Sequence, residues 1–343
     1  MNIELLDQAD PMCEAFVRGH PDGRICHLWA WSEAVQAGFR HRVYYLAARE
    51  DGAVHGVLPL MHVRSLLFGN HLVSHALSDY GGILADGDAA RDALFSRAVE
   101  LAGQLRAESI EFRNVQPLPY ELQVRTDKVS FRLALAANPE DVWGKFTSKS
   151  RIRNHVRTAE KAGITVADGG AELLDEFYGL YAPRMHQLGS PAYSKETLRL
   201  LLDRLPGNCR LFVARLGAQP VAVTLTFCFN GIVENSLGCT LVQYNNLNPN
   251  HMVFWGAMKH YCAAGAKWFE FGRSTRGGTG YNFKRQWLSE EVQLHYQYWV
   301  RPGTALSVPT PDSPKYKWKV DLWKRLPAAV ANWLGPRISR GLP

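Results

Sequence analysis

The sequence predicts an α/β protein made of two tandem copies of one unit, each with a mixed, largely antiparallel sheet, followed by a basic helical tail. Two internal repeats support the tandem arrangement: residues 44–62 are similar to 210–228, and residues 98–114 are similar to 257–273. Both matches occur in the same order along the chain, as expected of a duplicated unit. The tail is predicted from its charge, because residues 315–343 hold seven lysines and arginines against one acidic residue.

The first repeat predicts a β-hairpin. Its two copies are YYLAAREDGAVHGVLPLMH and RLFVARLGAQPVAVTLTFC. Each has an apolar strand ending in Ala-Arg, a glycine-containing turn and a second strand of alternating apolar residues. Ala48-Arg49 in the first copy corresponds to Ala214-Arg215 in the second.

The second repeat predicts a helix, a short break and a strand with apolar-Glu-Phe at its centre. The central carboxylates are those of Glu111 and Glu270. A carboxylate in the middle of a strand must be hydrogen-bonded or reach an open face. Because both copies have one, we expect a structural role shared by the two units. A hairpin, a helix and a strand in this order resemble the elements of a GNAT-type mixed sheet.

The repeats predict three regions. A first domain spans residues 1–128, a second spans 129–302, and a proline-containing linker with a basic amphipathic tail spans 303–343. In the second domain, Asn138 is a predicted helix N-cap with proline at the first helical position. A final strand over residues 292–300 is expected to close the second sheet.

The composition is that of a globular protein, with 46% hydrophobic and 21% charged residues. The sequence contains no run of 18 uncharged apolar residues, so it predicts no membrane-spanning helix. The N-terminus does not resemble a signal peptide. The six cysteines are scattered without a C-x-x-C pair, so we expect reduced structural thiols, a cytoplasmic location and no metal site.

Several segments carry a resemblance to a known family. KFTSKSRIRNHVRTAEKAGITV, NPNHMVFWGAMKHYCAAGAKWFEFGRS and GYNFKRQW, in this order, resemble the second domain of FemABX-type transferases. Leu58-Pro59-Leu60 and SDYGGILAD (78–86) resemble the matching part of their first domain. The resemblance covers roughly residues 25–300 and is closest to FemAB-like proteins associated with exopolysaccharide and PEP-CTERM sorting systems. It implies attack by an amine of a cell-wall precursor on an activated acyl ester, usually aminoacyl-tRNA.

The resemblance assigns catalytic roles to Lys284 and Asp86. Phe283-Lys284 matches the Phe-Lys pair that stabilises the oxyanion or holds the tRNA end, and the Gly-rich loop 272–280 before it permits close approach to a substrate. Asp86 matches an acidic residue near the acceptor and is expected to take a proton from the attacking amine. The sequence departs from the family at Ile83, where proline is usual. The alternatives are a solvated lysine and an ordinary turn aspartate.

A basic helix over residues 149–161 is the predicted phosphate-binding element. Ile152, Val156 and Ala159 recur at helical spacing and are expected to face the core. Basic residues on its other faces would bind the phosphates of a nucleotide-linked precursor or of tRNA, unless they form a solvated face. The predicted substrate-binding residues are Lys149, Arg151, Arg153, Arg157, Tyr80, Arg273, Tyr281 and Phe283.

The acyl donor stays open between aminoacyl-tRNA and acyl-CoA, and we expect it as a co-substrate rather than a tightly bound cofactor. Acetyl-CoA-dependent GNAT enzymes usually place Arg/Gln-x-x-Gly-x-Gly/Ala at a helix start, where amides hold the pyrophosphate. Here the corresponding YNNLNPNHMVFW has no glycine. The expected partners are an envelope or nucleotide-linked sugar precursor and tRNA. Two alternatives remain: an acyl-CoA-dependent N-acyltransferase acting on a sugar or lipid, and a non-catalytic polysaccharide-binding accessory protein.

The tail has an apolar repeat with a proline inside it. Trp318, Leu322, Leu326, Val330 and Leu334 recur every four residues. The proline at position 327 predicts a break rather than one straight helix. Tryptophan and leucine among basic residues are typical of a segment on an anionic membrane surface, here the inner face of the membrane. The alternative is a strap that packs on the two domains.

Overall fold

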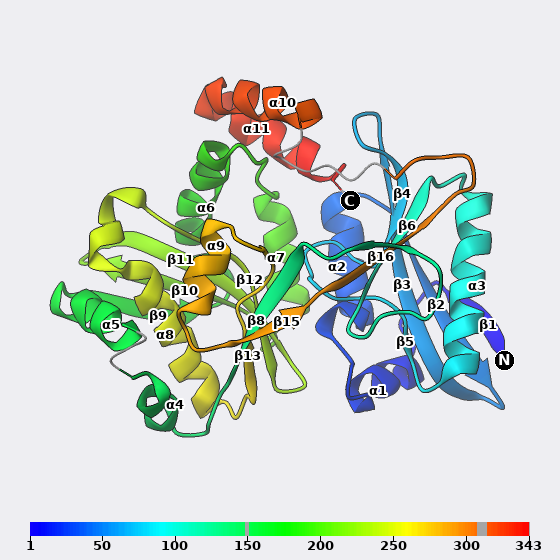
Figure 1. Ribbon diagram of the computed structural model, residues 1–343, viewed down its shortest axis with the longest axis horizontal. Coiled ribbons are helices and arrows are strands. Elements are labelled where there is room, and N and C mark those ends of the chain that lie inside the picture. Colours follow the sequence, from blue (N-terminus) through cyan, green and yellow to red (C-terminus); the bar gives the residue numbers. More distant parts are fainter. Residues whose placement is uncertain (148–150, 307–313, 343) are drawn as a thin grey trace. The chain divides into compact units, whose positions relative to one another are not determined.

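The computed structural model describes residues 1–147, 151–306 and 314–342 (Figure 1). The chain divides into two compact units. Unit 1 comprises Met1–Thr126, Leu294–Asp321 and Pro336–Pro343, and unit 2 comprises Asp127–Gln293 and Leu322–Gly335. No helix within the described ranges is long and apolar enough to cross a membrane.

Unit 1 is built on an eight-stranded sheet in the order β1-β2-β3-β4-β6-β16-β7, with β5 paired to β3. Its pairs are antiparallel except for β4 with β6. The strands are β1 (Asn2–Leu6), β2 (Val43–Glu50), β3 (Ala53–Ser65), β4 (Gly69–Val73), β5 (Leu84–Ala85), β6 (Ser109–Asn114), β7 (Gln123–Arg125) and β16 (His295–Val300).

Helices cover both faces of this sheet. Figure 1 shows α3 (Asp88–Gln104) on one face and α1 (Pro11–Gly19) and α2 (Trp29–Phe39) on the other, joined by the short η1 (Ile25–His27). Between α3 and the strands lies an apolar core that includes Leu94 and Phe112. Helix α1 begins where Asp10 accepts hydrogen bonds from two backbone N–H groups of its first turn.

Unit 2 has a second eight-stranded sheet in the order β14-β8-β13-β12-β11-β10-β9, with β15 paired to β8. Only β12 with β13 is parallel. The strands are β8 (Lys128–Ala134), β9 (Ile164–Gly169), β10 (Cys209–Leu216), β11 (Gln219–Phe229), β12 (Ile232–Thr240), β13 (Trp268–Glu270), β14 (Ser274–Thr275) and β15 (Glu290–Gln293).

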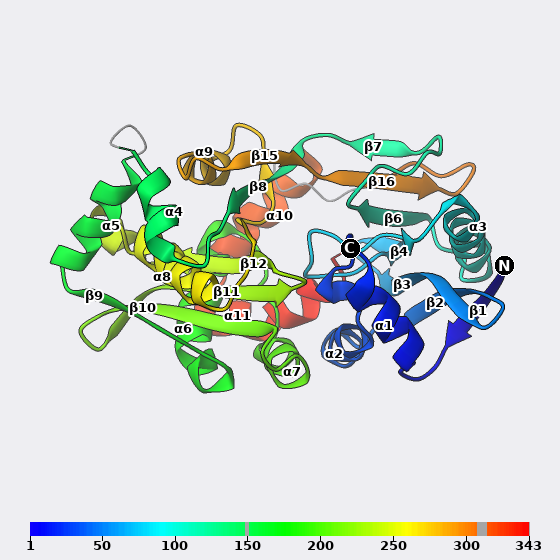
Figure 2. The ribbon, with the colours of Figure 1, turned by 90° about the horizontal axis from the view of Figure 1, so that it is seen from below.

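The helices of unit 2 also lie on both faces of its sheet, with α8 on one side and α6 on the other (Figure 2). The predicted cap at Asn138 is confirmed, because its side chain accepts a hydrogen bond from the N–H of Glu140. The helices are α4 (Pro139–Lys145), α5 (Ile152–Lys161), η3 (Ala171–Leu173), α6 (Leu174–Leu188), α7 (Lys195–Arg204), η4 (Val242–Leu247), α8 (Pro249–Ala263) and α9 (Thr279–Arg285).

The prediction of a single strand over residues 292–300 is wrong, because this segment forms two strands that belong to different sheets. Strand β15 pairs with β8 in unit 2, whereas β16 pairs with β6 and β7 in unit 1. The division falls at Leu294, which starts the returning segment of unit 1. Strand β16 therefore lies in the first unit, although the sequence placed residues 129–302 in one domain. Alternating apolar residues predict a strand but do not identify its partner.

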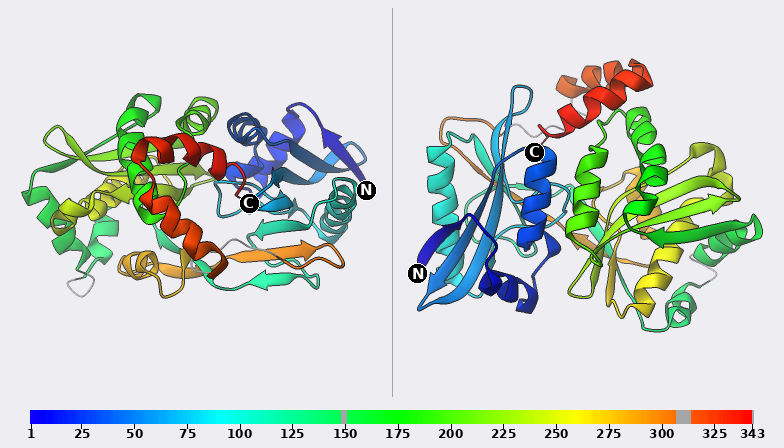
Figure 3. Two further views of the ribbon diagram at one scale, coloured as in Figure 1. Left: turned by 90° about the horizontal axis from the view of Figure 1, so that it is seen from above. Right: turned by 180° about the vertical axis from the view of Figure 1, so that it is seen from behind.

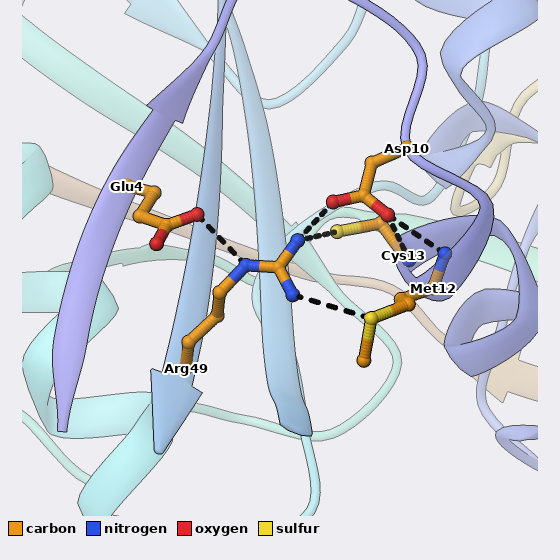
Figure 4. Close-up of polar contacts among 5 residues, drawn as sticks. All are labelled: Glu4, Asp10, Met12, Cys13 and Arg49. Atoms are coloured by element: carbon orange, nitrogen blue, oxygen red, sulfur yellow. Dashed lines mark hydrogen bonds and ion pairs between the residues drawn. The ribbon is translucent and has the colours of Figure 1, made fainter. Parts of the chain in front are cut away.

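The repeated Ala-Arg pair of the two hairpins marks the same irregularity in strand pairing. A register shift lies between Ala48 and Arg49 where β2 pairs with β3, and another lies at the equivalent Ala214 and Arg215 of β10. Both arginines then form ion pairs, but with different partners. Arg49 contacts Glu4 and Asp10 (Figure 4), and Arg215 binds both carboxylate oxygens of Glu176 at 2.6 and 2.7 Å.

The two mid-strand glutamates also have equivalent roles. Glu111 accepts a hydrogen bond from Nε of Arg113 at 2.6 Å, and Glu270 accepts from Nε of Arg132 at 2.9 Å. Both carboxylates are buried. A buried carboxylate needs such a partner, so the expected structural role of this repeated residue is confirmed.

The tail forms two helices, α10 (Pro314–Arg325) and α11 (Ala328–Ser339), which the views of Figure 3 show as separate segments. The break predicted at Pro327 is confirmed, because Pro327 lies between the two helices.

Candidate functional site

Unit 1 contains a cavity of about 220 Å³ beside the N-terminus of α3. It is lined by the loop after α1, by residues 81–88 and by the loop after β6. The predicted residue Asp86 lies in its wall, with His20 and Asn114 from the other two segments. Three stretches that are distant in sequence thus meet at one concave site, the usual form of a small-molecule site.

Two glycines shape the segment that leads to Asp86. Gly81 has a φ of +137°, and a Cβ there would lie 2.3 Å from the carbonyl oxygen of Ser74. A Cβ on Gly82 would lie 1.8 Å from Oδ1 of Asn114. Only glycine fits either position. Oδ1 of Asn114 instead accepts the backbone N–H of Ile83 at 3.3 Å, a bond that the proline usual in the resembled family could not donate.

His20 holds its ring toward Asp86. Nδ1 of His20 accepts the backbone N–H of Asp22 at 3.0 Å, so the ring proton of neutral His20 is on Nε2. Nε2 lies 3.4 Å from the carbonyl oxygen of Ala85 and 3.9 Å from Oδ1 of Asp86. The Asp86 side chain is 56% exposed. An exposed carboxylate with an N–H donor beside it can take up a proton from a bound group.

The cavity wall has an excess of negative charge. Asp22, Asp86 and Asp88 line it with one guanidinium, that of Arg91. Arg91 lies 2.6 Å from the carboxylate of Asp88 and 2.9 Å from that of Asp92 outside the wall. These charges favour a cationic ligand such as a protonated amine over a phosphate.

His27 contributes a neutral ring to the same wall. Its Nδ1 accepts the N–H of Arg24 at 3.1 Å, and its Nε2 donates to the carbonyl oxygen of Gly82 at 3.0 Å. Burial, with a smaller effect of the nearby Arg24 guanidinium, lowers the pKa of His27 to about 4. The neutral ring fixes the backbone at Gly82 without adding charge.

The sequence did not identify His20, His27 or Asn114 as site residues. The Gly81-Gly82 pair indicates that this segment has close neighbours but does not say which residues they are. Tyr80, predicted to bind substrate, lies in the core instead: it is 2% exposed, packs with Tyr296, and carries the guanidinium of Arg24 over its ring at 4.4 Å. Tyr80 does not line the cavity.

In unit 2, Lys284 lies in the last turn of α9 and contacts the start of the Gly-rich loop. Its ammonium donates to the carbonyl oxygens of Gly272 at 2.7 Å and Arg273 at 2.9 Å. Lys284 therefore ties α9 to the loop that follows β13. Two carbonyls also hold the ammonium group in a fixed position, which a preorganised oxyanion donor requires.

The other motif residues around α9 have mixed environments. Phe283 packs with its ring 4.9 Å from that of His251. The Tyr281 hydroxyl donates to Glu291 at 2.6 Å, which also raises the pKa of Tyr281. Phe283 and Tyr281 thus support α9 and are partly buried, whereas Arg273 is exposed.

Helix α5 presents its faces as predicted, since Ile152, Val156 and Ala159 are buried. Arg153 contacts the backbone at the end of α4. It donates to the carbonyl oxygens of Trp143 at 2.8 Å and Gly144 at 3.2 Å, at the C-terminal end of α4. Arginine at a helix C-terminus satisfies carbonyls that lack helical partners.

Of the basic residues predicted to bind substrate in this region, Arg151 and Arg157 are exposed; Lys149 lies outside the described residues. Arg151 lies near His155 and lowers its pKa, after the larger effect of burial. Nδ1 of His155 is 3.1 Å from Nε2 of His251, in the first turn of α8. Basic residues of α5 thus lie near the positive N-terminal end of α8, an arrangement that favours an anion.

The parallel strands β12 and β13 pair over three residues only, up to Glu234 and Glu270. A bulge in β12 follows at once, because Thr226 faces Asn235 whereas Leu225 faces Leu237. Strand β12 then continues to Thr240 and therefore extends past the end of its pairing with β13.

Neither a metal centre nor a cysteine nucleophile is evident in the described part of the chain. No group of three or more His, Cys, Asp or Glu side chains there could hold a metal ion. All six cysteines are free. Burial raises the pKa of Cys239 to about 12 and that of Cys228 to about 11, which disfavours the reactive thiolate.

Residues 147–285, which lie within unit 2, match a family model described as acetyltransferase (GNAT) domain. A search of curated protein sequences gives no match. Among solved structures, FemX is similar over 87% of this chain and 97% of its own, with a TM-score of 0.66 and 16% identity.

Two further structures are similar over most of their length. The C-terminal domain of a putative lysylphosphatidylglycerol synthetase from Agrobacterium fabrum has a TM-score of 0.55 and 12% identity, covering 84% of this chain and 90% of its own. A tandem GNAT protein from the clavulanic acid biosynthesis pathway has a TM-score of 0.51 and 11% identity, covering 89% and 100%. The chain therefore has a tandem GNAT-like fold, and its GNAT acetyltransferase domain supports an acyltransferase.

Proposed function

We propose that the protein transfers an acyl or aminoacyl group from an activated donor to an amine of a cell-envelope or exopolysaccharide precursor. The observation that carries this proposal is the cavity of unit 1, where Asp86 and His20 lie in a wall with excess negative charge. Such a wall attracts an ammonium group, the form in which most amines exist at neutral pH.

Asp86 is the proposed proton acceptor. The bound ammonium first loses one proton to the solvent. The neutral amine then attacks the donor carbonyl and forms the C–N bond, while the bond from carbonyl carbon to the donor oxygen or sulfur breaks. The surplus amine proton goes to the Asp86 carboxylate, and the leaving group departs with the electron pair of the broken bond. His20 supports this position through its Nε2–H, which donates to the carbonyl oxygen of Ala85, the residue before Asp86, at 3.4 Å.

Lys284 is the proposed stabiliser of the negative charge that develops on the donor carbonyl oxygen. Its ammonium is already oriented by the carbonyls of Gly272 and Arg273. A cation fixed before the reaction lowers the barrier more than one that must reorganise. Arg273, exposed beside it, would contact the donor.

The donor is proposed to bind along unit 2 through its phosphates. Both candidate donors, aminoacyl-tRNA and acyl-CoA, carry phosphate groups near an extended acyl-bearing arm. Arg151, Arg157 and the N-terminal end of α8 suit the phosphates. Strand β12 suits the arm, because it extends to Thr240, beyond its pairing with β13, and an extended ligand can bind along a strand by backbone hydrogen bonds.

The test is a search for the amide product by mass spectrometry. Wild-type protein is incubated with acetyl-CoA, longer acyl-CoAs or charged tRNA, and with amino sugars, amino-acid amides or peptide amines as acceptors. The proposal predicts an amide from one donor class. Transfer from acyl-CoA to an amino sugar would favour the sugar N-acyltransferase. If no donor binds to or reacts with the folded protein, the proposal is wrong, and the alternative function of a non-catalytic polysaccharide-binding accessory protein is favoured.

A further inference from the structure

We propose that two segments of the chain, the tip of the β3–β4 hairpin and the exposed faces of α10 and α11, each bind an anionic lipid bilayer. The hairpin tip is here residues 65–69, and the tail helices are α10 and α11. This inference is independent of the proposed reaction, because it concerns no residue of the cavity or of α9. It rests on exposed apolar side chains, on a contact between tail and hairpin, and on the charge around them.

The hairpin tip exposes two consecutive leucines. Leu66 is 108% exposed and Leu67 58% exposed, whereas the strands on either side of the tip are largely buried in the sheet. Turns favour glycine, asparagine, aspartate and serine, so turn chemistry does not explain two leucines. Figure 1 shows this hairpin extending beyond the other strands of unit 1. Its tip can insert into an apolar layer without disturbing the sheet.

The end of the tail packs at the base of the same hairpin. Gly341 leaves no room for a Cβ, which would lie 2.6 Å from Oγ of Ser65 and 3.5 Å from the Phe68 ring. Nε2 of His41 donates to the carbonyl oxygen of Arg340 at 2.7 Å. Within unit 1, the hairpin tip and the end of α11 therefore belong to one surface.

The tail helices bury one face and expose the other. Trp323 and Ala331 are buried, and the carbonyl oxygen of Trp323 accepts a hydrogen bond from Nε2 of His186 at 2.9 Å. The exposed large apolar residues of the two helices are Trp318, Leu322, Val330 and Trp333. The strap interpretation thus accounts for one face only. Tryptophan and leucine on the other face are typical of side chains at a membrane interface.

The charge around these apolar residues is positive. Residues 318–342 carry five basic side chains and one acidic one, and Arg64 precedes the hairpin tip. Several of the basic side chains, among them those of Lys324, Arg325 and Arg337, are exposed. A second copy of the chain would present the same charges and be repelled, whereas anionic lipid is complementary. The charges therefore favour a bilayer over a homodimer as the occupant.

Vesicle co-sedimentation of the full-length protein tests this proposal. The vesicles contain phosphatidylglycerol and phosphatidylcholine in equal amounts, or phosphatidylcholine alone. We expect binding to the anionic vesicles, weakened by salt, and little binding to neutral ones. The variants Leu66→Ser/Leu67→Ser and Trp318→Ser/Trp333→Ser should each bind at least about tenfold less. All four positions are exposed, so the substitutions should leave the melting temperature unchanged.

A matched control is Val124→Ser/Val242→Ser, which removes two valines that are each 54% exposed and lie outside the hairpin tip and tail helices. This variant should bind vesicles like the wild type. The proposal is overturned if the wild type ignores anionic vesicles at low salt, or if the hairpin and tail variants bind as the wild type does. The proposal is also overturned if sedimentation without lipid shows that the wild type is a dimer and that the hairpin and tail variants are not. That result would show that these apolar residues bind a second copy of the chain.

Discussion

The ammonium nitrogen of Lys284 lies 2.7 Å from the carbonyl oxygen of Gly272 and donates a hydrogen bond to it. This bond gives Lys284 a structural role besides its proposed catalytic one. Lys284→Met should lower turnover at least about 100-fold, because the oxyanion loses its donor. It should also lower the free energy of unfolding by about 1–3 kcal/mol, because a partly buried carbonyl loses its partner. Steady-state kinetics and chemical denaturation measure the two effects.

Two comparisons separate these roles. Lys259→Met removes an exposed lysine of α8 and should change neither turnover nor stability. Lys284→Arg should keep much of the stability, since a guanidinium can still reach the carbonyls. If Lys284→Met loses stability but keeps wild-type turnover in its folded fraction, Lys284 only holds the loop.

Asp86→Asn should lower kcat by about 10²–10⁴-fold, because the amide cannot accept the amine proton. The fold should be unaffected, since the Asp86 side chain is mostly exposed. His20→Gln should have a smaller effect on kcat, as expected of a positioning residue. The control Asp51→Asn removes an exposed carboxylate in the β2–β3 turn, where asparagine suits the φ of 49°. Equal activity of Asp86→Asn and Asp51→Asn would rule out Asp86 as the base.

The arginines of α5 should divide into two groups. Removing charge at Arg151 and Arg157 should weaken binding of CoA or tRNA and reduce its dependence on salt, because these side chains are exposed. Arg153→Gln should instead lower the free energy of unfolding by about 1–3 kcal/mol, since Arg153 satisfies carbonyls at the end of α4. Binding titrations at two salt concentrations and thermal melts measure these outcomes. Donor affinity that falls only in Arg153→Gln would contradict this division.

Acid should destabilise the protein through its buried histidines. Burial lowers the pKa of His27 to about 4 and that of His251 to about 3, and holds that of His75 well below its usual range. The unfolded chain takes up protons at these positions near pH 6.5, whereas the folded chain does not. The contribution of these neutral histidines to the free energy of unfolding is therefore complete above that pH. It is lost as the pH falls toward 4, and the loss for His27 alone is about 3 kcal/mol.

Urea unfolding at several pH values tests this expectation. His27→Gln should flatten the loss between pH 6.5 and 4, whereas His55→Gln, at a partly exposed position, should leave the profile unchanged. An identical pH profile in wild type and His27→Gln would show that other groups control acid unfolding.

The duplicated architecture could be predicted because local signals repeat along the chain. The Ala-Arg pairs at 48–49 and 214–215 mark the same register shift in both hairpins, and each mid-strand glutamate is a buried carboxylate paired with an arginine. The partner of β16 could not be predicted, because the sheet to which a strand belongs depends on contacts with residues far away in sequence. The segment 292–300 has one continuous apolar pattern but contributes to two sheets.

The candidate site could be predicted only where a motif marked it. Asp86 followed from the SDYGGILAD segment, and the cavity wall includes it. His20 and Asn114 carry no local signal, because the tertiary fold alone brings them to the segment 81–86. Arg153 illustrates a different difficulty. Its place in a basic helix predicted a contact with a ligand, but the sequence did not indicate that its guanidinium hydrogen-bonds the backbone at the end of α4.

A single-turnover assay of amide formation tests the central claim most directly. The wild type and each variant are mixed with the donor class that the wild type accepts and with an excess of amine, and the amide is followed by rapid quench and mass spectrometry. The account predicts that Asp86→Asn and Lys284→Met each bind donor but form amide at least about 100-fold more slowly, while Asp51→Asn and Lys259→Met match the wild type. Wild-type rates of amide formation in either folded catalytic variant would contradict it.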